Sequence, residues 1–196
     1  MKIKHYVIFA IVIMLGIGAG IYYLEVFRPG AAKLPDEIVM QTAFDETYDF
    51  DERPERARLI EFMYTRCPDV CPITTLEMAK LRTDLEKEGV FGEEVEFMTI
   101  TIDPKRDSLD ILQDYAERFE VNDTEDGWVF LRGSDEATEE IANALGFLYN
   151  DPGSGEIIHS TYLYFLDKDD NLLEKFTMGE SFDRDRVYDR IMRTIN

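Results

Sequence analysis

The chain has 196 residues, enough for one domain with a substantial core and a short accessory segment. It carries 21 basic and 41 acidic side chains, which gives a formal net charge of −20 at pH 7. This balance excludes nucleic acid as a partner, because binding a phosphate backbone requires clustered Lys and Arg. The charge is typical of a well-solvated surface, and attraction of a cationic partner or a metal ion is the alternative.

Residues 1–26 are predicted to be a membrane anchor. The first 24 residues contain no Asp or Glu, and residues 6–24 include nothing more polar than Tyr, Gly and Ala. An apolar run of this length crosses a bilayer as a helix. Basic side chains precede it, so the positive-inside rule leaves the N-terminus in the cytoplasm. We therefore predict a single-pass protein of a bacterial cytoplasmic membrane, with its C-terminal domain on the outer face.

A cleaved signal peptide is the alternative for this segment, because Gly18-Ala19-Gly20 resembles a cleavage site. The apolar run continues beyond that site, which favours an uncleaved anchor. Residues 27–36, with two prolines and a glycine, are predicted to be a linker. Residues 37–196 then form one exported domain.

Predicted strands and helices alternate along this domain. The first half contains one or two short strands within 38–50, a strand at 57–64, a helix at 72–88 and a strand at 95–102. Asp107 or Ser108 can cap a helix that runs to about Phe119, and Ser134 can cap one that Gly146 closes. The second half adds a strand at 128–131, a hairpin of 161–166 and 172–176, and a last helix from near Asp183. This order indicates the α/β class.

The two cysteines, Cys67 and Cys71, lie at the junction of a predicted strand and a predicted helix. Pro72 suits the first turn of a helix, where a missing N–H costs nothing. Cys71 is therefore expected beside a helix N-terminus, where the dipole and free N–H groups favour a thiolate. A disulfide across so short a loop would stabilise the fold little, which indicates a functional rather than a structural pair.

His159 is the only histidine outside the first five residues. Taken alone, one histidine beside a strand is more often a hydrogen-bonded structural residue. Together with Cys67 and Cys71, it completes a soft set of two thiolates and one imidazole, which suits copper as Cu(I) or Cu(II). Structural zinc normally needs four protein ligands, and Asp69, the carboxylate between the cysteines, is more typical of a turn residue.

Residues 64–72, Tyr-Thr-Arg-Cys-Pro-Asp-Val-Cys-Pro, resemble the signature of the Sco/SenC (PrrC) family, the synthesis-of-cytochrome-oxidase proteins. Three further stretches agree in order and spacing, namely Ile102-Asp103-Pro104-Lys105-Arg106-Asp107, Trp128-Val129-Phe130-Leu131-Arg132-Gly133 and His159-Ser160-Thr161. The family's usual Gly-Lys before the cysteine strand is replaced here by Arg53-Pro54-Glu55-Arg56. From its residues alone, the stretch 103–107 is interpreted as a turn and helix cap.

The resemblance implies a thioredoxin-like fold, with a central mixed β-sheet flanked by helices. It also implies one copper ion, bound by Cys67, Cys71 and His159. The implied function is a membrane-anchored metallochaperone that assists assembly of the dinuclear copper (CuA) centre of cytochrome c oxidase, whose copper-bearing subunit is the expected partner.

Two other functions use the same residues. The main alternative is an enzyme, a thiol–disulfide oxidoreductase that reduces the cysteines of the oxidase copper site or of other exported proteins. Cys67 and Cys71 would be its redox pair, with Cys67 as the attacking thiol. A redox-responsive or copper-responsive signalling component is the third interpretation.

Overall fold

The structure, a computed structural model, describes residues 4–6, 9, 13–18, 20, 32–125 and 127–195. The chain divides into two units, Met1–Ala31 and Ala32–Asn196. Most of the predicted anchor lies outside the described residues. Within the part that is described, no helix combines the length and the apolar character needed to span a bilayer.

A seven-stranded mixed sheet forms the centre of the second unit, in the order β2-β1-β5-β4-β3-β8-β9. These strands are β1 (Val39–Thr42), β2 (Thr47–Asp49), β3 (Ala57–Met63), β4 (Val95–Thr101), β5 (Trp128–Arg132), β8 (Tyr162–Leu166) and β9 (Leu172–Thr177). The three central strands β3, β4 and β5 are parallel, and antiparallel pairs extend the sheet on both sides. All residues of β3 and β4 are buried, as expected where helices cover both faces of a parallel sheet.

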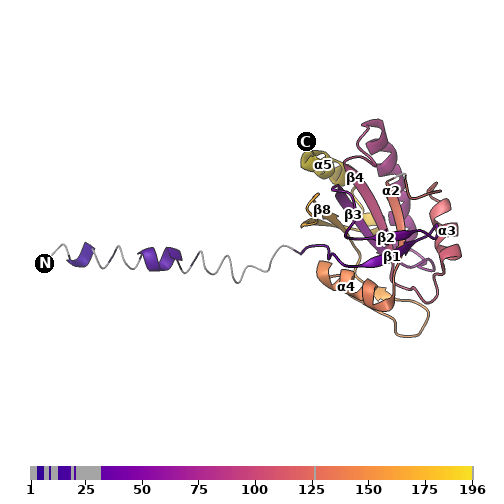
Figure 1. The fold of residues 1–196 in the computed structure, drawn as a ribbon, viewed down its shortest axis with the longest axis horizontal. Coiled ribbons are helices and arrows are strands. Elements are labelled where there is room, and N and C mark those ends of the chain that lie inside the picture. The colour runs from indigo at the N-terminus through magenta and orange to yellow at the C-terminus, as the bar shows by residue number, and fades with distance from the viewer. Residues whose placement is uncertain are drawn as a thin grey trace. The chain divides into compact units, whose positions relative to one another are not determined.

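Helices α2 (Val70–Lys87), α3 (Leu109–Glu117) and α5 (Arg184–Ile195) cover one face of the sheet, and α4 (Asp135–Leu145) covers the other (Figure 1). Side chains alternate along β3, so Leu59 and Met63 pack toward the three-helix face. Ile60 and Phe62 pack toward α4. The result is a three-layer α/β domain, which matches the predicted thioredoxin-like fold.

The predicted caps define several helix ends. Ser108 and Ser134 accept backbone hydrogen bonds from the first turns of α3 and α4 through their hydroxyls. Gly146 ends α4 in the left-handed conformation, with φ of 66°. The carboxylate of Asp183 accepts a backbone hydrogen bond from the first turn of α5. The sequence therefore predicts these helix ends correctly.

The described end of the predicted linker packs against the domain. Leu34 is fully buried, and its backbone N–H donates to the carbonyl of Asp170 over 3.1 Å. The N–H of Leu172 donates to the carbonyl of Ala32 over 2.7 Å. Residues 32–36 are thus attached to the start of β9, and residues 27–31 lie outside the described part.

A small second sheet, which the sequence does not predict, consists of β6 (Tyr149–Asn150) and β7 (Ile158–His159). The strands are antiparallel, with Tyr149 opposite His159. Strands of two residues are too short to show a periodic pattern, which is why only a turn-rich loop is visible in the sequence here. This hairpin carries the predicted third ligand.

Candidate metal centre

Cys67 and Cys71 lie where the chain leaves β3 and enters α2. Helix α2 starts at Val70, so Cys71 lies in its first turn and is fully buried. Cys67 precedes the helix and is half-buried, and both thiols are free. The backbone N–H of Cys71 donates to the sulfur of Cys67 over 3.4 Å. The helix N-terminus therefore stabilises negative charge on Cys67.

This arrangement makes Cys67 the thiolate of the pair. A hydrogen bond from the thiol of Cys71 is the largest cause that lowers the pKa of Cys67 to about 4, and it outweighs the opposing effect of burial. The same hydrogen bond, burial and the negative charge of Glu61 raise the pKa of Cys71 well above its usual range. The sequence favoured a thiolate at Cys71. That prediction is wrong, because the thiol of Cys71 donates to the sulfur of Cys67, and the N–H of the first turn adds a smaller effect in the same direction.

His159 reaches the site from β7. Its Nε2 lies 4.0 Å from the sulfur of Cys71, and the candidate ligand atoms of His159, Cys67 and Cys71 all lie within 4.8 Å of one another. Its Nδ1 lies 2.7 Å from the carbonyl oxygen of Ser160. An imidazole that donates through Nδ1–H keeps the Nε2 lone pair for a metal ion. Burial lowers the pKa of His159, but hydrogen bonds with Cys67 and Ser160 outweigh it and raise the pKa overall.

Two aromatic rings hold the imidazole. The ring of Tyr64 meets it edge-on, with centroids 5.9 Å apart, and the ring of Phe147 stacks near it at 6.0 Å. Phe147 in turn stacks on Phe62 of β3 at 4.4 Å. The orientation of His159 therefore depends on the core of the domain as well as on its own short strand.

A buried carboxylate lies beneath the cysteines. Glu61 of β3 is fully buried and accepts hydrogen bonds from the hydroxyls of Thr75, at 3.1 and 3.2 Å, and Thr99, at 3.2 Å. The Thr75 hydroxyl also lies 2.9 Å from the carbonyl oxygen of Cys71. Burial raises the pKa of Glu61 to about 8, partly offset by the two hydroxyls. Glu61 was not predicted as a site residue from the sequence, although one acidic side chain within a largely apolar strand was the available signal.

The structure brings together all three predicted ligands, from the β3–α2 junction and from β7. Two sulfurs and one imidazole nitrogen form a soft donor set, which suits copper better than a hard cation. Asp69, considered as a fourth ligand for zinc, is exposed and does not belong to the cluster. The donor set therefore fits copper, and a carboxylate-completed zinc site lacks support among the described residues.

Comparison with known proteins agrees with this site. The chain is 27% identical over 202 residues to an SCO2-like protein of Rickettsia conorii, a match that covers 92% of this chain and 95% of that protein. The crystal structure of Arabidopsis thaliana ScoI with copper bound is 20% identical, with a TM-score of 0.68 over 81% of this chain and 95% of its own. At such identity the structural likeness establishes the fold alone.

A second solved structure has the same architecture. BsSco, described as a member of the Sco family of cytochrome c oxidase assembly proteins with a disulfide switch, has a TM-score of 0.70 and 21% identity. The match covers 83% of this chain and 92% of that chain. The model of the family described as SCO1/SenC matches residues 41–196, which is most of the sequence. The chain therefore belongs to the SCO1/SenC family.

Proposed function

We propose that the protein is a copper metallochaperone, which binds one copper ion through Cys67, Cys71 and His159 and passes it to a partner. The convergence of three soft ligand atoms within 4.8 Å of one another carries this proposal. Cys67 is a thiolate at neutral pH, since its pKa lies near 4. Metal binding then has to displace the proton of Cys71 and, at low pH, that of His159.

The three proposed copper ligands differ in their exposure to solvent, and this gives them different roles in copper transfer. Cys71 is fully buried, whereas Cys67 and His159 are half-buried. An incoming ligand from a partner protein therefore approaches on the side of Cys67 and His159. Copper leaves by exchange of these two ligands while Cys71 still holds it, and the ion is never released to water.

The acceptor in this proposal is the CuA centre in the copper-bearing subunit of cytochrome c oxidase. Support comes from the family resemblance and from BsSco, described as belonging to a family of oxidase assembly proteins. The anchor at residues 1–26 is part of the same proposal and is supported by the acid-free, apolar sequence of the first 24 residues. It would hold the domain at the outer face of the cytoplasmic membrane, close to a membrane-bound acceptor.

Thiol–disulfide exchange is the second candidate function, favoured by the opposite pKa shifts of the two cysteines. The Cys67 thiolate would attack a partner disulfide, form a mixed disulfide and release one partner thiolate. Cys71, after losing its proton, would attack the sulfur of Cys67 and release the second partner thiolate. The partner gains two electrons and the chain is left with a Cys67–Cys71 disulfide. The raised pKa of Cys71 slows the second attack, and this favours metal capture.

Titration of the reduced full-length chain with Cu(I) and with Cu(II) tests the proposal. We expect one copper per chain, held at least about tenfold more weakly in His159→Ala, which corresponds to about 1.4 kcal/mol. Asp69→Asn is the control, since this exposed carboxylate lies outside the cluster, and it should bind copper like the parent chain. A chain that binds no stoichiometric copper but cycles a Cys67–Cys71 disulfide would instead support the oxidoreductase.

A further inference from the structure

The turn Asp103–Asp107 lies between the two segments that carry the candidate ligands. It follows β4, which pairs in parallel with β3, so it begins beside the point where the chain turns toward Cys67. The backbone N–H of Ile102 donates to the carbonyl of Met63 over 2.8 Å and joins the two strand ends. The sequence indicated only a turn and a helix cap, but its side chains make contacts in two further directions.

In one direction, the turn holds the cysteine loop. Asp107 is fully buried, and its carboxylate accepts hydrogen bonds from the backbone N–H of Thr65, over 3.1 Å, and from the Thr65 hydroxyl. The Asp103 carboxylate lies 3.1 Å from the guanidinium of Arg66. Thr65 and Arg66 immediately precede Cys67, so the position of its sulfur depends on both carboxylates.

In the other direction, the turn holds the hairpin of His159. Arg106 places one guanidinium nitrogen 3.2 Å from the Asp103 carboxylate and the other 2.5 Å from the Asp151 carboxylate. Asp151 directly follows β6, in which Tyr149 pairs with His159. A chain of alternating charges therefore joins the cysteine loop to the hairpin, in the order Arg66, Asp103, Arg106, Asp151.

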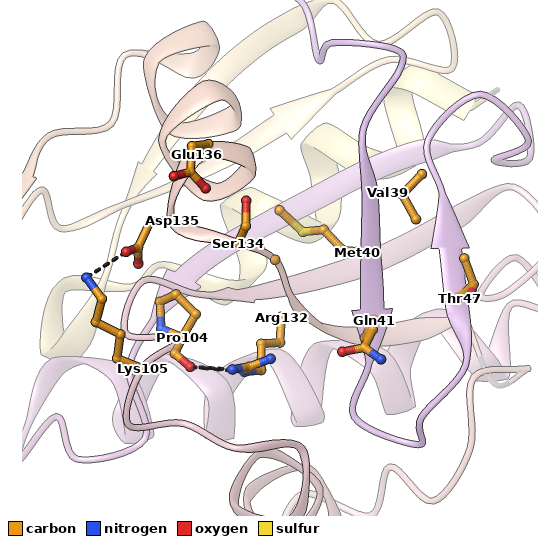
Figure 2. A pocket seen from close by; sticks show the side chains of 11 residues that line it. Val39, Met40, Gln41, Thr47, Pro104, Lys105, Arg132, Ser134, Asp135 and Glu136 are labelled. Carbon is orange, nitrogen blue, oxygen red and sulfur yellow. Dashed lines mark hydrogen bonds and ion pairs between the residues drawn. The ribbon is translucent and has the colours of Figure 1, made fainter.

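The turn itself is fixed to the sheet and to α4. Arg132, at the end of β5, donates to the carbonyl oxygens of Pro104, at 2.8 and 3.0 Å, and Asp107, at 3.0 Å. Lys105 extends away toward α4, where it pairs with Asp135 at 2.6 Å (Figure 2). The turn is thus a firm support from which Asp103 and Arg106 reach the two ligand segments.

These ion pairs contribute little to the stability of the whole domain. The side chains of Arg106 and Asp151 are each 36% exposed, and solvent screening makes ion pairs of that kind weak. An ion pair that weak cannot determine the fold. It is strong enough to favour one position of a hairpin whose strands have only two residues each. Its effect therefore falls on the geometry of the site.

We propose that Asp103 and Arg106 are positioning residues of the copper site, which set the separation between His159 and the cysteine pair by holding Asp151. The inference rests on the proposed function, because it assigns a task to these residues at the same site. It predicts that loss of Arg106 leaves both cysteines available for copper and weakens the bond to the imidazole.

The test compares Arg106→Ala with Lys105→Ala in the full-length chain. Both variants remove one positive charge from the same turn, but Lys105 pairs with Asp135 of α4, whereas Arg106 pairs with Asp151 next to β6. Competition with a chromophoric chelator should show copper affinity reduced by about fivefold to tenfold in Arg106→Ala and unchanged in Lys105→Ala. Arg106→Lys should restore part of the affinity, since a lysine still reaches one of the two carboxylates.

Two further variants show whether the effect passes through the proposed contacts. Asp151→Asn should weaken copper binding like Arg106→Ala, and the double variant should be no weaker than either single one. In a His159→Ala background, Arg106→Ala should have no further effect. Equal effects of Arg106→Ala and Lys105→Ala, or an undiminished effect in the absence of His159, would overturn the proposal.

A measurement without metal separates this inference from the proposed function. In the parent chain, the rings of His159 and Tyr64 lie close enough for proton–proton nuclear Overhauser effects, with centroids 5.9 Å apart. Arg106→Ala should weaken these signals and Lys105→Ala should preserve them. Unchanged signals in Arg106→Ala would refute the positioning role, whatever the copper titration of the parent chain shows.

Discussion

The backbone nitrogen of Cys71 and the sulfur of Cys67 lie 3.4 Å apart in the first turn of α2. Together with a hydrogen bond from the Cys71 thiol, which is the largest cause of the lowered pKa of Cys67, this contact distinguishes two thiols that look equivalent in the sequence. Cys67 receives the hydrogen bonds and becomes the thiolate, whereas Cys71 is buried and keeps its proton until a metal ion or a disulfide partner takes its place.

Cys67 should react as a thiolate well below neutral pH. Because its pKa lies near 4, the rate of alkylation by iodoacetamide should be almost constant between about pH 6 and 8. Cys71→Ala removes the largest cause of the lowered pKa, so the rate should then rise with pH over this range. Cys71→Ser is the matched control, because its hydroxyl still donates. A rate in the parent chain that climbs about tenfold per pH unit would contradict this assignment.

Copper affinity should depend on pH in a way that identifies the imidazole as a ligand. The pKa of His159 is raised, so the metal has to displace a proton from the imidazole as the pH falls through that pKa. Cys71 releases its proton at every pH in this range. The logarithm of the affinity should therefore rise by about two per pH unit below the pKa of His159 and by about one above it.

The same titration of His159→Ala provides the control. Without the imidazole, the slope should stay near one throughout, because only the proton of Cys71 is displaced. Chelator competition at several pH values measures both slopes. Parallel curves for the parent chain and the variant would show that His159 does not bind the metal.

Glu61 should make the reduced, metal-free protein less stable as the pH rises. Its pKa is about 8 in the folded state, against 4.5 for an exposed carboxyl, so between these values the folded state holds a proton that the unfolded state has lost. The free energy of unfolding then falls with rising pH, by at most about 1.4 kcal/mol per unit. Below about pH 4 this contribution is fully present, and above about pH 8 it is gone.

Glu61→Gln isolates this effect, because glutamine keeps the shape and cannot titrate. Urea denaturation at several pH values should show a smaller decline for the variant than for the parent chain across this window. Equal declines would mean that Glu61 is ionised in the folded protein. Thr75→Val removes one of the hydroxyls that lower the pKa of Glu61. In this variant the decline of the free energy of unfolding should therefore extend to higher pH than in the parent chain.

Arg58 should be far more important for stability than its surface counterparts. It is fully buried in β3 and pairs with Glu96 at 2.6 Å and with Asp170 at 2.5 Å. Arg58→Met leaves two largely buried carboxylates without this partner, and we expect a loss of about 3–5 kcal/mol in urea denaturation. Arg186→Ala breaks an exposed pair with Glu174 and should cost less than about 1 kcal/mol. Similar losses would show that the buried guanidinium contributes no special stability.

Elements with strong local signals were predictable from the sequence. The buried strands β3 and β4 are rich in apolar residues, and Ser134 and Gly146 mark both ends of α4 through backbone chemistry that depends on near neighbours only. The cysteine pair and His159 were also visible as a soft ligand set. Their meeting within 4.8 Å depends on strand order, so it followed from the family resemblance and not from any local pattern.

The features that could not be predicted from the sequence depend on contacts whose geometry or partners local residue patterns do not determine. The choice of Cys67 as the thiolate depends mainly on which of the two thiols donates its hydrogen to the other, and neighbouring residue types do not determine this. The sequence contains Asp103 and Arg106 in a turn motif, but Asp151, the second carboxylate that pairs with Arg106, is 45 residues away from it. Glu61 is an unexpected residue in a buried strand. Only the folded structure shows that its hydrogen-bond donors, Thr75 and Thr99, come from α2 and β4.

The sheet of β6 and β7 is separate from the seven-stranded sheet. The loop between these two strands can therefore change length without altering the register of any central strand. The cysteine half of the site is fixed by the β3–α2 junction, whereas the third ligand, His159, lies on the separate β6–β7 hairpin. Changes in this hairpin can thus alter the third ligand of the site without disturbing the pairing of the central strands.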